Sequence, residues 1–298
     1  MGPNHVPAGA DTTDTPEERL ERGGLLHYPQ APFPLPAGED LQFLLAQELG
    51  GRAHKNISYD PATGKVSGFA RRGGDQAGRL RSLFAAFSRD VTAWMANTFP
   101  RYAAGWQLDR CSYRPQEEAT RRLRQTARND LLHVDAFPNR PSQGQRILRV
   151  FANVNPRDPR IWVTSAPFAR LLERYGAAAG LPDGHAAGWL RGLGAGVIGL
   201  FRPGRARRSA YDSFMLRFHD YLKKNDEFQE RGPKRLWTFL PGAVWVAMTD
   251  TCSHAVLRGR YALEHSYFVA PSAQALPRES PPALLEAACA AARSARAA

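Results

Sequence analysis

The segment Leu131-Leu132-His133-Val134-Asp135 carries the strongest structural signal in the chain. On an extended strand, side chains two residues apart point to the same side, so His133 and Asp135 would place an imidazole beside a carboxylate. On a helix the two side chains would diverge. One further His from elsewhere in the fold would complete a facial triad of two His and one carboxylate, an arrangement that binds a metal ion.

The missing ligand is expected late in the chain, at the end of a strand that neighbours the His133 strand. Two His residues qualify. His254 follows the apolar run 245–250 across a short polar turn, which would present its side chain at a strand end. His265 lies inside the next apolar run, where a side chain is more often packed or part of a wall. His254 is therefore the preferred third ligand, and His265 is the alternative.

Length and composition indicate a globular protein. With 298 residues, of which 43% are hydrophobic, the chain can bury the core of one large domain. Its first residues are polar and acidic, unlike a secretory signal, and no apolar run is long enough to cross a membrane, so a cytoplasmic location is expected. The three Cys residues lie far apart, which disfavours both a disulfide framework and a Cys-ligated zinc site.

The formal net charge of +12 indicates an anionic partner. Nucleic acid is not expected, because the chain lacks a zinc finger, a helix-turn-helix signal and an aromatic RNA-binding signature. A phosphorylated or carboxylated substrate, or an anionic membrane surface, would satisfy the same charge. The glycine-rich, then arginine-rich stretch 188–208 fits two interpretations, a membrane-docking element and a loop that closes over the site.

Charge and periodicity divide the chain into three parts. Residues 1–38 lack periodicity and are predicted to form a flexible N-terminal arm that packs in part through residues 25–28. Residues 39–270 are predicted to form a single domain with a helical insertion at about 166–232, which would cover the mouth of a site. Residues 271–298 are predicted to form a C-terminal tail.

Within the central domain, two amphipathic helices and a hairpin precede a series of short strands. Helices are predicted at 41–49 and 79–97, and a hairpin at 56–69. The predicted strands span 106–114, 131–136, 147–154, 160–164, 236–240, 244–250 and 261–269. Short strands separated by Pro and Gly turns predict an α+β protein with a double-stranded β-helix (jelly-roll) core, on which the N-terminal helices pack.

Four segments, taken in order, resemble one family of enzymes. They are LHVDAFP at 132–138, RILRVFANVNP at 146–156, YDSFMLRFHDYL at 211–222 and TDTCSHAV at 249–256. Together they resemble the Kdo hydroxylases, a family of iron(II)- and 2-oxoglutarate-dependent dioxygenases that hydroxylate 3-deoxy-D-manno-oct-2-ulosonic acid (Kdo). The resemblance covers about residues 40–270.

The resemblance implies an oxidoreductase that uses Fe(II), 2-oxoglutarate and O2. His133, Asp135 and His254 would hold the metal and form the catalytic centre. The distal carboxylate of 2-oxoglutarate needs a buried cation, best an Arg that can bind it with two hydrogen bonds.

Two Arg residues compete to bind this carboxylate. Arg149 is preferred, because strand alternation places it on one face with Phe151 and Asn153, as in a polar-lined barrel interior. Asn153 is accordingly a further predicted cosubstrate contact. Arg260, which opens the final strand, is the second candidate. Arg114, which ends the strand before His133, is expected to bind the substrate carboxylate or the cosubstrate.

The implied substrate is Kdo attached to lipid A, in the biosynthesis or modification of lipopolysaccharide. Peripheral association with the cytoplasmic face of the inner membrane is a related expectation, since a lipid-linked sugar is found there. Two alternatives stay open: the same chemistry on another anionic substrate, and a non-catalytic jelly-roll module that binds sugar or lipopolysaccharide. Arg149 has a structural alternative too, an ion pair with a buried carboxylate such as Asp250.

Overall fold

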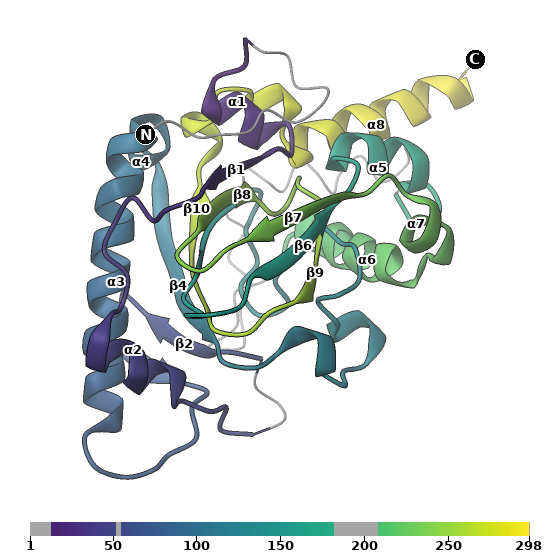
Figure 1. Ribbon diagram of the computed structural model, residues 1–298. Helices are drawn as coiled ribbons and strands as arrows, with labels where there is room; N and C mark the ends of the chain where they lie inside the picture. The colour runs from purple at the N-terminus through teal and green to yellow at the C-terminus, as the bar shows by residue number, and fades with distance from the viewer. Residues whose placement is uncertain (1–12, 52–54, 182–207, 298) are drawn as a thin grey trace, which may run out of the picture.

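The computed structural model describes residues 13–51, 55–181 and 208–297. Their strands form two antiparallel sheets, one of seven strands in the order β1-β8-β5-β10-β4-β2-β3 and one of three in the order β7-β6-β9 (Figure 1). The strands are β1 (Leu25–Tyr28), β2 (Ile57–Asp60), β3 (Lys65–Ser67), β4 (Trp106–Arg114), β5 (Arg146–Asn153), β6 (Arg160–Thr164), β7 (Arg235–Phe239), β8 (Val244–Met248), β9 (His254–Arg258) and β10 (Ala262–Val269).

Helices surround the two sheets, and short 3-10 turns connect several elements. The α-helices are α1 (Pro16–Glu21), α2 (Gly38–Leu45), α3 (Gln76–Thr98), α4 (Pro100–Ala103), α5 (Phe168–Tyr175), α6 (Ala210–Lys224), α7 (Asp226–Arg231) and α8 (Pro281–Ala297). The 3-10 turns used below are η1 (Glu118–Thr120) and η2 (Gln125–Ala127). None of the described helices is both long and apolar enough to span a membrane.

The 23-residue helix α3 packs on one face of the large sheet, at the left of Figure 1. Its apolar residues recur every three or four positions, so that they form one buried stripe. The stripe consists of Leu80, Phe84, Phe87, Val91 and Met95. These side chains share a core cluster with the residues of β5 and β10 that point to the same face. The predicted packing of an N-terminal helix on one sheet is confirmed.

The opposite face of β5 is polar and aromatic. Alternation turns Leu148, Val150 and Ala152 of β5 toward α3, and it turns Arg149 and Phe151 toward the space between the two sheets. There the Phe151 ring lies 5.3 Å from the Trp245 ring of β8 and 4.7 Å from the Trp162 ring of β6, measured between centroids. These rings fill the interior of the jelly roll and leave the cavity described below at one end of it.

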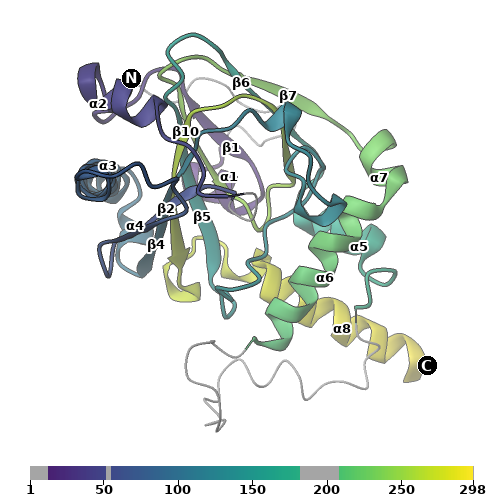
Figure 2. The ribbon, with the colours of Figure 1, turned by 90° about the horizontal axis from the view of Figure 1, so that it is seen from below.

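Helices of the predicted insertion cover only part of the small sheet (Figure 2). α5, α6, α7 and α8 form a second core cluster that buries Val163 of β6 and Ala255 of β9. Residues 182–207 lie outside the described residues. The sequence stretch 188–208, predicted to dock on a membrane or close over the site, is therefore described only at Arg208, which donates to the Pro138 carbonyl.

The termini hold more structure than predicted. β1 pairs with β8 at the edge of the large sheet, with Leu26 opposite Val246, and α1 begins with a capping box in which Thr15 and Glu18 take part. The boundary predicted at residue 38 therefore cuts off an edge strand of the domain. A four-residue strand and a six-residue helix are too short to show a hydrophobic period, which is why the sequence indicated a loose arm.

The segment 131–136 differs from its predicted form. It is not a full strand but makes a single antiparallel bridge, between His133 and His254. β9, which begins at His254, was not predicted either, because its five residues follow directly on the polar turn that the sequence suggested. The side-chain pairing argued from an extended conformation still holds at the bridge.

Candidate active site

A backbone bridge brings the three predicted ligands together. The N–H groups of His133 and His254 each donate to the carbonyl of the other residue, at 3.1 and 2.9 Å. The Asp135 N–H donates to the Thr249 carbonyl at 2.7 Å, which ties the segment to the chain just after β8. One ligand atom from each of His133, Asp135 and His254 lies within 4.8 Å of the others, and all three side chains are buried.

Each of the two imidazoles is oriented by its own main chain. His133 Nδ1 lies 2.7 Å from the Leu131 carbonyl oxygen, and His254 Nδ1 lies 2.9 Å from the Cys252 carbonyl oxygen. Because a carbonyl oxygen can only accept, each Nδ1 carries the hydrogen and each Nε2 keeps its lone pair. His133 Nε2 is 3.5 Å from Asp135 Oδ1, so the free lone pairs and the carboxylate face one point.

Burial and neighbouring charges set the protonation of these groups. Burial lowers the pKa of His133 and of His254, and Lys223 lowers that of His133 further. Burial alone would raise the pKa of Asp135, but Arg149 and His133 hold it well below its usual range. Two neutral imidazoles and one carboxylate are the donor set that a divalent first-row metal takes, with coordination positions left for other ligands.

A row of alternating buried charges runs from Asp135 into the barrel. Arg149 donates from Nη1 to Asp135 Oδ2 at 2.6 Å, and its Nη2 lies 2.7 Å from Glu264 Oε2 on β10. Glu264 accepts a second hydrogen bond from Arg114 Nε on β4, at 2.9 Å. Arg149 therefore fixes one oxygen of Asp135 and leaves the other oxygen, Oδ1, facing the imidazoles.

Glu118, in η1, continues the row. Its Oε1 lies 3.6 Å from Nη1 of Arg114 and also 3.6 Å from Nη2 of Arg160 on β6. Its Oε2 accepts from Asn129 Nδ2 at 3.1 Å and lies 3.8 Å from Arg121 Nη1. A single carboxylate thus faces three guanidinium groups, so positive charge is in excess at this end of the row.

A small cavity lies between this row and the triad. It is lined by Arg114, Asn129, His133, Asp135, Arg149, Phe151, Arg160, Trp162, His254 and Val256. The Trp162 ring stacks on the His254 ring at 5.0 Å between centroids with an interplanar angle of 14°, which restricts rotation of that imidazole. A bound anion would meet arginine on one wall of the cavity and the triad on another.

Arg160 is the cation of this cavity that the protein compensates least. Its Nη1 donates to the Gly259 carbonyl at 2.8 Å, whereas its buried Nε has no hydrogen-bond partner among the described residues. Burial lowers the pKa of Arg160 to about 10, with only partial compensation by Glu118. Arg114 is as deeply buried, but Glu264 and Glu118 more than offset that burial and raise its pKa. Arg160 therefore has donors to offer to a ligand.

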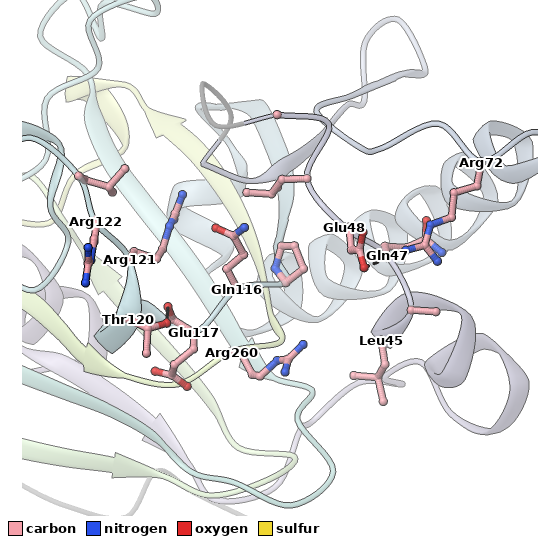
Figure 3. Close-up of a pocket in the computed structure, with 15 residues that line it drawn as sticks. Leu45, Gln47, Glu48, Arg72, Gln116, Glu117, Thr120, Arg121, Arg122 and Arg260 are labelled. Carbon is pink, nitrogen blue, oxygen red and sulfur yellow. Dashed lines mark hydrogen bonds and ion pairs between the residues drawn. The ribbon is translucent and has the colours of Figure 1, made fainter.

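A second, much larger hollow lies along the segment 115–123 (Figure 3). This groove has a volume of about 1120 Å³, and the residues 45–51 form its opposite wall. Arg260 projects into it from the turn between β9 and β10. Gln116, Glu117, Arg121 and Arg122 line the near wall.

The comparison with known families agrees with this arrangement. A family model for the 3-deoxy-D-manno-oct-2-ulosonic acid (Kdo) hydroxylases matches residues 6–292, nearly the whole chain. The chain belongs to the Kdo hydroxylase family. No curated protein sequence matches it. The family predicted from four short segments is confirmed, and the match extends over both termini.

Solved structures of a Kdo hydroxylase share the fold. KdoO, a non-heme Fe(II) α-ketoglutarate-dependent dioxygenase in complex with α-ketoglutarate and Fe(III), is 33% identical with a TM-score of 0.78, over 91% of this chain and 88% of that chain. Its cobalt(II) complex is 34% identical with a TM-score of 0.79 over the same shares. The predicted jelly-roll fold and the predicted enzyme class, a dioxygenase, are confirmed by this likeness.

In this Kdo hydroxylase family member, the other predicted site residues are divided between the cavity and its surroundings. Arg149 and Arg114 line the cavity. Asn153 does not, because its amide donates to the carbonyls of Asp158 and Phe239 at 3.0 and 2.9 Å. The structure therefore corrects the prediction that Asn153 contacts the cosubstrate: its side chain fixes the loop between β5 and β6 instead.

Arg260 also lies outside the cavity, in the large groove, so its predicted role as the anchor of 2-oxoglutarate is corrected too. His265, the alternative ligand, points to the opposite face of β10, where its Nε2 lies 2.8 Å from the Ser88 hydroxyl of α3. Arg149 does pair with buried carboxylates, as the structural alternative expected, but they are Asp135 and Glu264. Asp250, the example given, pairs with Arg146 at 2.8 Å instead.

Several residues of the site were missed from the sequence, among them Arg160, Glu264 and Trp162. Arg160 begins β6 and resembles an exposed strand end, yet alternation places it on the same face as the buried Trp162. Glu264 is a lone carboxylate within an apolar strand, which is a signal for a buried cationic partner. Trp162 itself was assigned only to a strand. The sequence contained a clue to each of these residues, but the residue that each one contacts in the site lies far away in the sequence.

Proposed function

We propose that this chain hydroxylates Kdo in a reaction that couples the substrate to 2-oxoglutarate and dioxygen. One oxygen atom is inserted into a C–H bond of the sugar. The other enters 2-oxoglutarate, which loses CO2 and becomes succinate. The observation that carries the proposal is the convergence of His133, Asp135 and His254 beside a cavity lined with arginine. Membership of the Kdo hydroxylase family supplies the substrate.

His133 Nε2, Asp135 Oδ1 and His254 Nε2 are proposed to hold the metal. An Fe(II) ion bound to them supplies the redox chemistry that activates dioxygen. The protein keeps the three donors in place through hydrogen bonds behind them. The imidazoles donate from Nδ1 to the Leu131 and Cys252 carbonyls, and Arg149 donates to the carboxylate. Such supporting contacts set the orientation and basicity of metal ligands.

Arg160 is proposed to bind the distal carboxylate of 2-oxoglutarate. Its Nε lacks a partner and its Nη2 is 3.6 Å from Glu118, beyond hydrogen-bond distance, so the two adjacent donors of one edge are available to one carboxylate. Arg149 and Arg114 are less suited, since Asp135 and Glu264 already accept their short hydrogen bonds. Arg114, Arg149 and Arg160 all line the cavity. With Asp135 assigned to the metal, only the carboxylates of Glu118 and Glu264 remain to balance these three charges, so at least one arginine has no countercharge.

Aromatic and aliphatic side chains complete the cavity. Phe151, Trp162 and Val256 line the walls that carry no charge. They keep water away from the reacting atoms, which strengthens the electrostatic interactions inside the cavity. The stack of Trp162 on His254 also stops the imidazole from turning away from the metal position.

We further propose that the Kdo substrate is attached to lipid A. A lipid-linked substrate would bring the enzyme to the cytoplasmic face of a membrane. One surface of the described residues favours such docking. Leu236 and Leu240 on one side of β6, and Leu257 on the other, are 63%, 60% and 39% exposed. Leu236 of β7 and Leu257 of β9 belong to the small sheet, Leu240 directly follows β7, and none of the three is part of the core cluster that the helices form.

Charge on this open face suits an anionic lipid surface. Arg258 shares the face, since it pairs across the sheet with the half-buried Ile161. No acidic residue occurs in β6, β7 or β9. Exposed leucines beside a cation, on a chain of net charge +12, match an anionic interface in which apolar groups enter the headgroup region.

Vesicle flotation tests the docking. Wild-type protein is expected to float with anionic vesicles and not with neutral ones. The L236S/L240S variant is expected to lose this association, whereas L108S, which changes an exposed leucine on β4, keeps it. Equal association of the wild type and L236S/L240S would contradict docking through this face.

The hydroxylation is tested with Kdo-bearing lipid A, Fe(II), 2-oxoglutarate and oxygen. Succinate and a Kdo product heavier by one oxygen atom are expected together. H133A, D135A and H254A are expected to abolish both products, and H265A, which removes a buried His on the other face of β10, is the matched control. Full activity in any of these three variants would contradict the assignment of His133, Asp135 and His254 as metal ligands.

The same experiment separates the alternatives. A non-catalytic binding module would retain the lipid-linked sugar without forming succinate. A dioxygenase for another anionic substrate would form succinate only with that substrate, and purified Kdo-bearing lipid A would be returned unchanged in mass.

A further inference from the structure

The groove beside the cavity has the size and lining of a binding site that the reaction centre does not use. Its two walls are residues 45–51, which follow α2, and residues 115–123, which follow β4 (Figure 3). The volume of about 1120 Å³ is large enough for a sugar unit or more. Polar and charged side chains dominate the near wall, so a hydrophilic ligand is favoured.

Arg260 is held rigidly at the base of the groove. It stands between Gly259, with φ +121°, and Tyr261, with φ +63°, two residues in the left-handed region. Hydrogen bonds fix both neighbours: Gly259 N–H donates to Glu117 at 2.6 Å, and Tyr261 N–H donates to the Arg114 carbonyl at 2.8 Å. Gly259 adopts its positive φ without strain, whereas Tyr261 is strained, and backbone strain that the surroundings hold in this way is typical of functional sites.

The guanidinium of Arg260 is oriented without being neutralised. Its Cζ lies 3.9 Å from the centroid of the Tyr261 ring, and no carboxylate pairs with it among the described residues. A cation laid on an aromatic ring keeps its N–H edges available for hydrogen bonds. Arg260 is thus positioned to receive an anion.

The acidic residues of the groove are already engaged. Glu48 pairs with Arg72 at 2.8 Å at the far end. The carboxylate of Glu117 accepts from the N–H groups of Gly259 and Ala119. Arg122, which is exposed in the near wall, has no acidic partner in the described part of the chain. Arg122 and Arg260 therefore leave the groove with a positive excess.

The inner end of the groove adjoins the reaction centre. Arg121 lines the groove, donates to the Lys55 carbonyl at 3.2 Å and lies 3.8 Å from Glu118, the carboxylate that faces Arg160 of the cavity. A substrate centred on the triad could therefore extend from its reacting sugar into the groove.

We propose that this groove is a subsite for a second anionic group of the substrate, a phosphate or a carboxylate on the unit next to the reacting sugar, with Arg260 as its ligand and Arg122 as a further positive charge in the near wall. The subsite rests on the proposed hydroxylation and narrows its substrate to a polyanionic saccharide. Free Kdo, which carries one carboxylate, would leave the groove unfilled.

Three Kdo glycosides test the subsite: one of a neutral sugar, one of a sugar phosphate, and a Kdo disaccharide that carries a second carboxylate. For the wild type, the KM of at least one anionic glycoside is expected to be lower than that of the neutral glycoside by about tenfold or more, with a similar kcat, because two partly exposed charge contacts contribute to binding. The double variant R122S/R260S is expected to remove this difference. The matched control R101S/R157S, which removes two exposed arginines elsewhere, is expected to keep it.

The outcomes separate the sources of the anion. A low KM for the phosphate glycoside alone assigns phosphate, and a low KM for the disaccharide alone assigns carboxylate. Equal KM values for all three glycosides, or an equal loss in R122S/R260S and R101S/R157S, overturn the subsite.

A binding measurement tests the subsite independently of whether the chain hydroxylates Kdo. Inorganic phosphate and acetate are titrated by NMR into protein loaded with zinc and 2-oxoglutarate, so that the cavity is already filled. Chemical-shift changes at Arg122 and Arg260 for one of these anions support the subsite even if no glycoside is hydroxylated. No change with either anion contradicts it.

Discussion

Replacing Arg160 by Gln is expected to weaken the binding of 2-oxoglutarate by about 100-fold. The guanidinium is 1% exposed, and its Nε and Nη2 are the donors without a short protein contact. Each hydrogen bond between a buried charged donor and a carboxylate contributes about 1.5 kcal/mol, so the loss of two amounts to about 3 kcal/mol, or roughly 100-fold in Kd. Glu118 keeps its contacts with Arg114 and Asn129 in the variant.

Calorimetry on cobalt-loaded protein without oxygen measures this effect. The titration compares 2-oxoglutarate with 2-oxopentanoate, which has the same 2-oxo acid end but lacks the distal carboxylate. The wild type is expected to prefer 2-oxoglutarate by the full factor of about 100, and Arg160→Gln is expected to bind both compounds with similar, weak affinity. The ratio of the two affinities reports the contribution of the distal carboxylate, because the two compounds share the 2-oxo acid end.

Arg146→Gln is the matched control. Arg146 is also a buried arginine, but its guanidinium pairs with Asp250 and does not line the cavity. This variant is expected to lose stability and to keep the preference for 2-oxoglutarate. The reasoning is refuted if Arg160→Gln still prefers 2-oxoglutarate as the wild type does, or if the variant loses affinity for both compounds by the same factor.

Three further results are expected. Arg149→Met should weaken cobalt binding by about 10- to 100-fold in a competition titration, because Asp135 loses the hydrogen bond that orients it; unchanged affinity would contradict this role. Glu264 has a pKa lowered to about 2, so its contribution to stability is complete above pH 4.5 and is lost as the pH falls toward 2; thermal melts of Glu264→Gln should lack that part of the wild-type decline. Asp250→Asn should lower the free energy of unfolding by about 3 kcal/mol in urea titrations, since Arg146 is left unpaired, while metal affinity stays the same.

The convergence of His133, Asp135 and His254 could be predicted because most of its signal is local. Two side chains at a spacing of two residues need only an extended backbone to converge, and the structure supplies it through one bridge, although no full strand forms. His254 was preferred over His265 because a strand end presents a side chain and a strand interior packs it, and both side chains lie as that argument requires. The face of Arg149 followed in the same way from strand alternation.

The partners of the arginines could not be predicted, because they depend on register between distant strands. Arg149 is opposite Ser266 in the pairing of β5 with β10, and that register is what brings Glu264 within reach. Nothing near Arg149 in the sequence distinguishes Glu264 or Asp135 from Asp250 as its partner. Arg260 was misplaced for a related reason: a turn with two left-handed residues points its side chain away from the barrel.

The proposed positions of the metal and of the cosubstrate lie at opposite ends of one row of alternating charges, so we expect binding at one position to affect binding at the other. A cation at Asp135 Oδ1 would take part of the negative charge of that carboxylate, while the Arg149 hydrogen bond to Oδ2 stays in place. Arg149 would then attract Glu264 more strongly, Glu264 would attract Arg114 less, and Arg114 would attract Glu118 more. The far end of the row, Arg160, is left with more charge to offer. We therefore expect positive cooperativity, and thermodynamic reciprocity requires 2-oxoglutarate to raise the affinity for the metal by the same factor. An enzyme built this way retains its iron best when its cosubstrate is abundant.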